Sequence, residues 1–328
     1  MKLVAKMVAA ALAVSAMGVA AGAHAQEYPG GKPVSAVVPF AAGGPTDKVA
    51  RELTAIMSKQ LGTTIVIENL GGAGGTIGAK KVAQSKNDGY TVLIHHIGMA
   101  TAPALYRNLG FDPLKDFEMV GEIADVPMIL VGNKQLPPSN FKDLVPYIKA
   151  NASKLSLANA GIGSASHLCG LLFQSAIQTE LTTVPYKGAA PALTDILGGQ
   201  VNLLCDQTTN LAGHLKASSV KSYAAMQARR VEAFKDVPTA AEQGMPGVEV
   251  KVWHAMYAPK GTPKPVIDKL SAALQKAVAD PAFRAKMAEL GAEAVPAQRA
   301  TPESLRTYLS AEINKWTPVI KKAGVYAD

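Results

Sequence analysis

Short runs rich in β-branched residues alternate with amphipathic stretches along most of the chain, and this alternation is the strongest constraint on its fold. The runs predicted as strands are residues 35–39, 64–68, 91–95, 128–132, 155–158, 201–205 and 220–226. The stretches predicted as helices are residues 47–61, 76–84, 141–150, 164–177, 190–197 and 208–217. Because strand–helix–strand units form right-handed crossovers, the pattern predicts an α/β fold with mostly parallel sheets.

The C-terminal portion has a different pattern. Residues 263–279, 281–290 and 301–316 are predicted as helices with little strand between them. Pro263, Pro281 and Pro302 lie in their first turns, where the missing N–H of proline costs nothing. We expect these helices to pack back over a sheet that is already formed.

The N-terminus has the three parts of an export signal. Lys2 and Lys6 precede an uncharged, mostly apolar stretch over residues 7–22, which ends in the small-x-small sequence Ala23-His24-Ala25. A membrane anchor is the competing interpretation, because the stretch is only slightly short of the roughly 18 to 20 residues that span a bilayer. Its alanine-rich composition and the cleavage sequence favour a signal peptide over residues 1–25, and therefore a periplasmic protein. There is no cysteine near the cleavage site, which argues against a lipid anchor.

Removal of these 25 residues from 328 leaves 303, a length typical of two domains. The net charge falls from +8 to +6, because the segment contains two lysines. The basic residues are scattered rather than clustered, which favours a solvated surface over nucleic-acid binding, although a positive field attracts anions. Cys169 and Cys205 could form one disulfide in an oxidising compartment, but the sequence does not tell whether they lie close enough.

A glycine-bearing turn follows the first predicted strand and leads into a helix. In an open parallel sheet such a turn lies at the carboxyl edge of the strands, where ligands bind. Its free N–H groups and the positive helix end suit an anion, with Thr46 or Asp47 as the predicted N-cap. The alternative is that the glycines only form a turn. The candidate ligand-binding residues here are Phe40, Ala42, Gly43, Gly44, Thr46 and Asp47.

A second turn of the same kind follows the strand at residues 155–158. Its candidate ligand-binding residues are Gly161, Gly163, Ser164 and Ser166. Two such turns, one in each half of the chain, could close on one ligand from opposite sides. Phe40 could cover that ligand or simply pack in the core.

A third glycine-rich turn, residues 69–78, does not fit a nucleotide-binding motif. The spacing of its glycines departs from G-x-G-x-x-G, and the Gly-Lys-Ser/Thr end of a P-loop is absent. We therefore expect a flexible loop near the same cleft, and no cofactor.

Ser164, His167 and Asp206 are the residue types of a hydrolase triad. However, Ser164 and His167 lie three residues apart on one predicted helix, and no G-x-S-x-G sequence surrounds any serine. Ser164 is more simply an N-cap or a ligand donor, and His167 a helix residue that hydrogen-bonds locally. No two histidines have the H-x-x-x-H spacing of metal ligands on a helix, so no metal site is expected.

Several ordered motifs resemble the Bug family of tripartite tricarboxylate transporter receptors. They are VPFAAGGPTD at residues 38–47, YKGAAPALTD at 186–195, GGQV at 198–201, DVPT at 236–239 and APKGTP at 258–263. The resemblance implies a two-domain, type II (Venus-flytrap) periplasmic binding protein in which residues 40–47 and 161–166 grip one carboxylate. It also implies delivery of that solute to a membrane permease of the tripartite tricarboxylate type.

We expect domain 1 to comprise residues 26–125 and 247–328, and domain 2 residues 126–246. The expected ligand is a small organic acid, aromatic acids included, bound by a monomer without enzymatic activity. Asp206 keeps its family position, but its neighbours and the loop at residues 95–99 are individual, so the identity of the acid does not carry over. The alternatives are a secreted hydrolase using Ser164 and His167, and a ligand-sensing partner of a signalling kinase.

Overall fold

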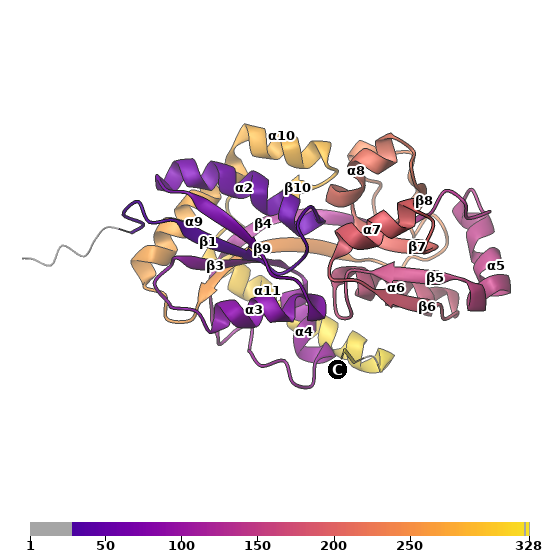
Figure 1. Cartoon of the computed structure of the whole chain (residues 1–328), viewed down its shortest axis with the longest axis horizontal. Helices are drawn as coiled ribbons and strands as arrows, with labels where there is room; N and C mark the ends of the chain where they lie inside the picture. The colour runs from indigo at the N-terminus through magenta and orange to yellow at the C-terminus, as the bar shows by residue number, and fades with distance from the viewer. Residues whose placement is uncertain (1–27, 325, 328) are drawn as a thin grey trace, which may run out of the picture.

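Two long strands cross the middle of the molecule and join its two α/β halves (Figure 1). We describe them from a computed structural model of residues 28–324, 326 and 327, so the predicted signal peptide lies outside the described residues. Strand β4 (Phe117–Gly132) pairs antiparallel with β9 (Lys251–Pro259) up to the pair Pro127–Lys251. From Met128 onward β4 pairs instead with β7 (Leu203–Gln207) and β8 (Lys221–Ala225).

The first half contains the sheet order β2–β1–β3–β9–β4, in which β1 is parallel to both its neighbours. Its other strands are β1 (Val34–Val38), β2 (Ile65–Asn69), β3 (Thr91–His96) and β10 (Glu293–Ala294), which pairs with β4. Helices α2 (Pro45–Leu61), α9 (Lys264–Ala279) and α10 (Pro281–Glu289) pack against one another on one side (Figure 1). On the other side lie α3 (Thr76–Ala83), α4 (Gly98–Leu105) and α11 (Pro302–Ala323).

The second half is smaller and contains β4, β7 and β8 together with β5 (Ser156–Asn159) and β6 (Thr182–Pro185). Strand β5 is parallel to β6 and β7. Its helices are α5 (Phe141–Asn151), α6 (Ala165–Ile177), α7 (Ala189–Leu197) and α8 (Thr208–Lys216). Three short 3₁₀ turns complete the elements: η1 (Ala73–Gly75), η2 (Ala152–Lys154) and η3 (Glu232–Phe234). Within the described residues, no helix combines the length and the apolar character needed to cross a bilayer.

The α/β alternation appears as predicted, with element ends shifted by a few residues. Strands β2, β1 and β3 run parallel to one another, as do β6, β5 and β7. The two crossing strands, β4 and β9, are antiparallel to every strand with which they pair. The sequence did not indicate β9, β6, β10, α4 or the first two-thirds of β4. Strand β9 is buried almost throughout, so it lacks the alternation that marks a one-sided strand. Pro103 interrupts the helical pattern of α4.

A disulfide joins Cys169 on α6 to Cys205 on β7, with the two Cα atoms 6.1 Å apart. Ser166, one turn before Cys169 on α6, donates its hydroxyl to the Cys205 carbonyl oxygen at 2.6 Å. Both contacts fix the beginning of α6 to the strand that ends in Asp206. The sequence left the state of these cysteines open, and the structure places them in a bridge.

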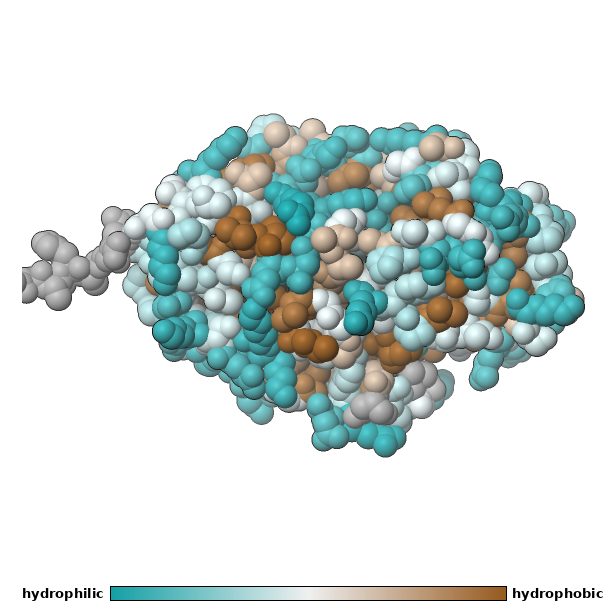
Figure 2. All heavy atoms as spheres, viewed as in Figure 1, coloured by the Kyte–Doolittle hydropathy of each residue, from teal (hydrophilic) through white to brown (hydrophobic). Residues whose placement is uncertain are grey.

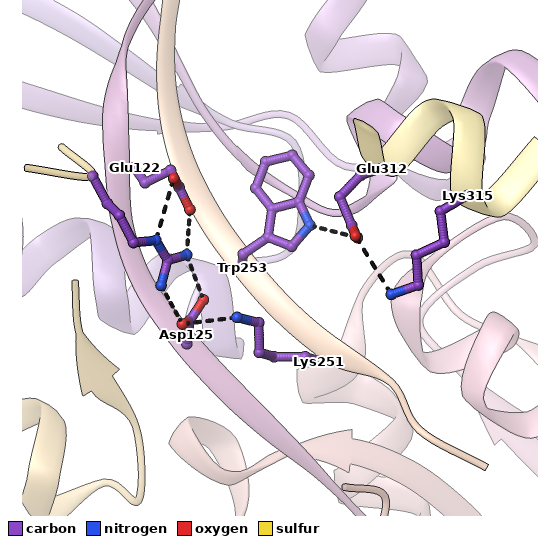
Figure 3. A network of polar contacts seen from close by, with 7 residues as sticks. Glu122, Asp125, Lys251, Trp253, Glu312 and Lys315 are labelled. Carbon is purple, nitrogen blue, oxygen red and sulfur yellow. Dashed lines mark hydrogen bonds and ion pairs between the residues drawn. The ribbon is translucent and has the colours of Figure 1, made fainter. Parts of the chain in front are cut away.

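A charged network fastens the segment before α11 to the crossing strands (Figure 3). Arg299 donates to Glu122 at 2.5 Å and to Asp125 at 2.8 Å, and both carboxylates lie on β4. Lys251 on β9 donates to Asp125 at 3.0 Å, immediately beside the point where β4 changes partners. Glu122 is only 1% exposed, so its charge depends on Arg299 for compensation.

Replacement of Arg299 by alanine therefore leaves a buried carboxylate without its cation. We expect Arg299→Ala to lower the free energy of unfolding by about 3 kcal/mol, measured by urea denaturation at pH 7. The matched control is Arg230→Ala, which removes an ion pair with Glu242 whose partners are 45% and 44% exposed. The control should cost less than about 1 kcal/mol. Equal effects of the two substitutions would show that the network does not stabilise the crossing strands.

Candidate functional site

A narrow cavity of about 10 Å³, room for about one water molecule, lies between the two closed halves. The first half contributes Phe40, Pro45, Thr46 and His96. The second half contributes Ala160, Ser164, Ala165, Ser166, Ala189, Asp206 and Gln207. The beginnings of α2, α6 and α7 all border this space. Because the first N–H groups of a helix have no intrahelical partner and carry a partial positive charge, the cavity suits an anion.

The turn before α2 is shaped by glycine and held by a buried carboxylate. Gly43 has a positive φ of 77°, and the observed N-cap is Gly44, with Pro45 at the first helical position. The prediction of Thr46 or Asp47 as N-cap was therefore wrong, because proline already occupies the position at which a helix readily begins. Thr46 faces the cavity, whereas Asp47 does not border it.

Asp47 holds this turn in place from its buried side. It accepts hydrogen bonds from Gly43 N–H at 2.9 Å, from Arg51 at 2.8 Å and from Asn69 at 2.9 Å. Burial alone would raise the pKa of Asp47, but the hydrogen bonds from Arg51, Gly43 and Asn69 hold it below its usual value. Asn69 also donates to the Phe40 carbonyl oxygen at 3.1 Å, so this amide on β2 positions the binding turn, which the sequence did not reveal.

The turn before α6 has the second glycine pair and a side-chain cap. Gly161 and Gly163 have φ values of 111° and 84°. Ser164 is the N-cap of α6 and accepts from the backbone N–H of His167 at 3.2 Å. The ring Nδ1 of His167 accepts from Gly163 N–H at 3.2 Å, and burial lowers the pKa of His167 to about 4, which keeps that nitrogen unprotonated. Ser164 and His167 thus have the local capping roles expected of them.

The same contacts do not form a hydrolase triad. The hydrogen bond between Ser164 and His167 uses the backbone of the histidine, so the imidazole does not accept the serine proton. The Asp206 carboxylate accepts from Asn210 at 2.6 Å and from Gln207 N–H at 2.7 Å instead of from His167. Among the described residues, no imidazole accepts a hydrogen bond from the Ser164 hydroxyl, as a triad would require.

Asp206 borders the cavity from the second half. Burial raises its pKa to about 6, although hydrogen bonds from Asn210 and Gln207 and the charge of Lys48 act in the opposite direction. Lys48 on α2 donates to the Asn210 side chain on α8 at 3.3 Å. This hydrogen bond connects the two halves beside the cavity.

Three buried histidines form a cluster on the first-half side of the cavity, a feature that the sequence did not predict; of the three, His96 borders the cavity. His95 and His96 end β3, and the antiparallel pairing with β9 places His254 directly opposite His96. Phe40 stacks on His96, with ring centroids 4.6 Å apart, and Thr46 Oγ1 lies 3.2 Å from His254 Nε2. Burial lowers the pKa of all three histidines, and the neighbouring rings lower it further. In residues 28–324, no three metal-ligating side chains are arranged to hold a metal ion.

The halves are in contact around the cavity. A Cβ added at Gly71 would meet the Lys187 carbonyl oxygen at 2.8 Å, and one at Gly74 would overlap the Ile162 carbonyl oxygen. Tyr106 donates to that same oxygen at 2.8 Å. Figure 2 shows the atoms of the two halves meeting across the middle of this face. The glycine turn at residues 69–78, predicted as a loop near the cleft, therefore lies in the contact between the halves.

The structure divides the predicted ligand-binding residues into two groups. Phe40, Thr46, Ser164, Ser166 and Asp206 border the cavity. The remaining ones, which shape the turns without bordering it, are Ala42, Gly43, Gly44, Asp47, Gly161 and Gly163. Six residues that border the cavity were not predicted from the sequence: Pro45, His96, Ala160, Ala165, Ala189 and Gln207. A contact of any of these residues with a ligand stays a prediction.

Known proteins resemble the chain over most of its length. A family model described as "tripartite tricarboxylate transporter family receptor" matches residues 49–325. A UPF0065 protein of Agrobacterium vitis is 47% identical over 302 residues, which is 92% of this chain and 87% of that protein. The structure of the periplasmic binding protein BugD matches with a TM-score of 0.88 and 51% identity, over 90% of this chain and 98% of that one. MatC from Rhodopseudomonas palustris with bound malate matches with a TM-score of 0.85 and 40% identity, over 88% and 98%.

The buried histidines make stability depend on pH. His95, His96, His167 and His254 have lowered pKa values in the folded state and an ordinary pKa near 6.5 when unfolded. The unfolded chain therefore binds more protons below pH 6.5, and folding stability falls as the pH decreases from there. Each such imidazole lowers the free energy of unfolding by up to about 1.4 kcal/mol for each pH unit of this decrease. Asp206, with its raised pKa, opposes this loss between about pH 6 and pH 4.

Urea denaturation at pH 7 and pH 5 measures this dependence. We expect a lower free energy of unfolding at pH 5, and a larger decrease in the variant Asp206→Asn, which lacks the opposing carboxyl group. Equal or greater stability at pH 5 in the unsubstituted protein would contradict the neutral, buried state of the histidines.

Proposed function

The chain belongs to the tripartite tricarboxylate transporter receptor family, as its motifs predicted, and we propose on this premise that it is a periplasmic receptor that captures a small carboxylate between its two halves. The observation that carries the proposal is the convergence of helix beginnings on one cavity. Thr46 on α2 and Ser166 on α6 border it from opposite halves. A carboxylate held there accepts hydrogen bonds from backbone N–H groups of both turns.

The expected energies are sufficient for binding. An anion at a helix beginning gains about 0.3 to 1 kcal/mol, and up to about 2 kcal/mol when partly buried. A charge-assisted hydrogen bond contributes about 1.5 to 3 kcal/mol. Three or four such contacts, less the cost of association, supply the roughly 8 kcal/mol of micromolar affinity.

Similarity supports a small acid as the ligand. The malate-bound relative MatC is 40% identical to this chain. We propose that the ligand contacts come from the residues predicted in the two turns and from Asp206, with the carboxylate lying between the turns.

Location and transport follow from the same premise. We propose that residues 1–25 direct export and are removed, and that the receptor delivers its solute as a monomer to a membrane permease of the tripartite tricarboxylate type. A disulfide such as Cys169–Cys205 persists in an oxidising compartment, which supports the periplasmic location. We further propose domains at residues 26–125 with 247–328 and at 126–246, with a hinge where β4 and β9 cross.

We propose a binding role without catalysis. The absence of an imidazole acceptor for Ser164 supports binding over hydrolysis.

The direct experiment is a thermal-shift screen of the mature protein with mono-, di- and tricarboxylates, followed by calorimetry. We expect at least one small acid to raise the melting temperature, because a ligand at one hundred times its Kd stabilises by about 2.7 kcal/mol. Ester hydrolysis is measured in parallel with the unsubstituted protein and with Ser164→Ala. No stabilisation by any carboxylate, together with hydrolysis that depends on Ser164, would reject the receptor function in favour of an enzyme.

Closure of the halves gives a second prediction. In Gly74→Ala the added methyl group overlaps the Ile162 carbonyl oxygen of the other half, so the closed arrangement is disfavoured. We expect this variant to bind the acid identified in the screen at least about tenfold more weakly. The control is Gly62→Ala. Gly62 has a positive φ of 67°, similar to the 60° of Gly74, so the backbone strain is matched, but its added methyl group meets nothing within 4 Å. Unchanged affinity in Gly74→Ala would show that binding does not need this contact.

A further inference from the structure

The ring of His96 is held in one orientation beside the cavity. Its Nδ1 accepts a hydrogen bond from Gly98 N–H at 3.0 Å. Phe40 stacks on one side of the ring with an interplanar angle of 24°, and His254 meets it edge-on with ring centroids 5.8 Å apart. The side chain is 2% exposed, and it borders the cavity from the first half.

This orientation determines which nitrogen of the ring carries the proton. A neutral imidazole has one N–H donor and one acceptor nitrogen, and Nδ1 already serves as the acceptor. The proton therefore lies on Nε2. In the part of the chain that the structure describes, no group accepts a hydrogen bond from His96 Nε2. Because burial and the neighbouring His254 ring keep the pKa of His96 well below its usual value, the group is a neutral donor rather than a cation.

The opposite wall holds an unpaired acceptor. Gln207 ends β7, is 4% exposed and borders the same cavity from the second half. Its side-chain oxygen Oε1 is buried and has no hydrogen-bond partner among the described residues. A buried polar group without a partner is destabilising, so a ligand that satisfies both groups binds more tightly than one that leaves them unpaired.

We infer that His96 and Gln207 together recognise a hydroxyl group of the ligand, so that the receptor selects a small hydroxy acid over the same acid without its hydroxyl. A hydroxyl group both accepts and donates a hydrogen bond. It would accept from His96 Nε2–H and donate to Gln207 Oε1, while the carboxylate lies between the beginnings of α2 and α6. The inference rests on the proposed receptor function and specifies its substrate class.

The experiment compares matched pairs of acids by calorimetry: malate with succinate, and lactate with propionate. We expect the unsubstituted protein to bind the hydroxy member of at least one pair at least tenfold more tightly, because the other member leaves two buried groups unpaired. In His96→Asn the amide oxygen replaces Nδ1 as the acceptor for Gly98 N–H, but the Nε2–H donor is lost. This variant should retain binding, and the preference for the hydroxy acid should fall to about threefold or less.

Two further variants distinguish loss of the proposed hydroxyl contacts from a general loss of structure. His95→Asn is the matched control, because His95 is equally buried, accepts from a backbone N–H through Nδ1 in the same way and does not border the cavity. It should keep the preference. Gln207→Met keeps the side-chain length without the acceptor, and it should lose the preference from the opposite wall.

The outcomes separate this inference from the proposed function. Equal affinity of the unsubstituted protein for both members of every pair that it binds would overturn the hydroxyl inference and leave the receptor function standing. A preference that survives in both His96→Asn and Gln207→Met would also overturn it. Failure of the unsubstituted protein to bind any carboxylate would reject the receptor function and the inference with it.

Discussion

The antiparallel pairing of β4 with β9 is the constraint on which the rest of the structure depends. These strands carry the chain from the first half to the second and back, and β4 changes partners after the pair Pro127–Lys251. The Arg299 network fastens this point to the segment before α11. Because β9 also pairs with β3, the same crossing brings His254 opposite His96, which borders the cavity. The connection between the halves and the chemistry of the site thus have a common origin.

The site itself depends on where parallel strands end. Strands β1 and β5 each lead into a glycine turn and then into a helix, so two helix beginnings meet in the cavity. Side chains behind each turn hold it rigid: Asp47 and Asn69 behind the first, and the Cys169–Cys205 disulfide behind the second. Rigid turns keep their N–H groups directed at the ligand without further loss of entropy on binding, which favours affinity.

Local sequence patterns predicted the parts of this arrangement that depend on neighbours along the chain. The glycine turns, the cap at Ser164 and the expected helices all follow from residues within a few positions of one another. Contacts between distant residues could not be predicted in the same way. The histidine cluster requires the register of β3 with β9, and β9 itself escaped prediction because burial on both faces removes its alternation. The contact of Gly74 with Ile162 likewise exists only once the two halves have met.

The central claim is that one carboxylate lies between the beginnings of α2 and α6 when the halves are closed. A crystal structure of the mature protein with the acid that stabilises it most tests this claim directly. The account predicts carboxylate oxygens within about 3 Å of backbone N–H groups from both turns, with the ligand enclosed by Phe40, Thr46 and Ser166. A ligand bound outside this cavity, or held by one half alone with the other turned away, would contradict the account.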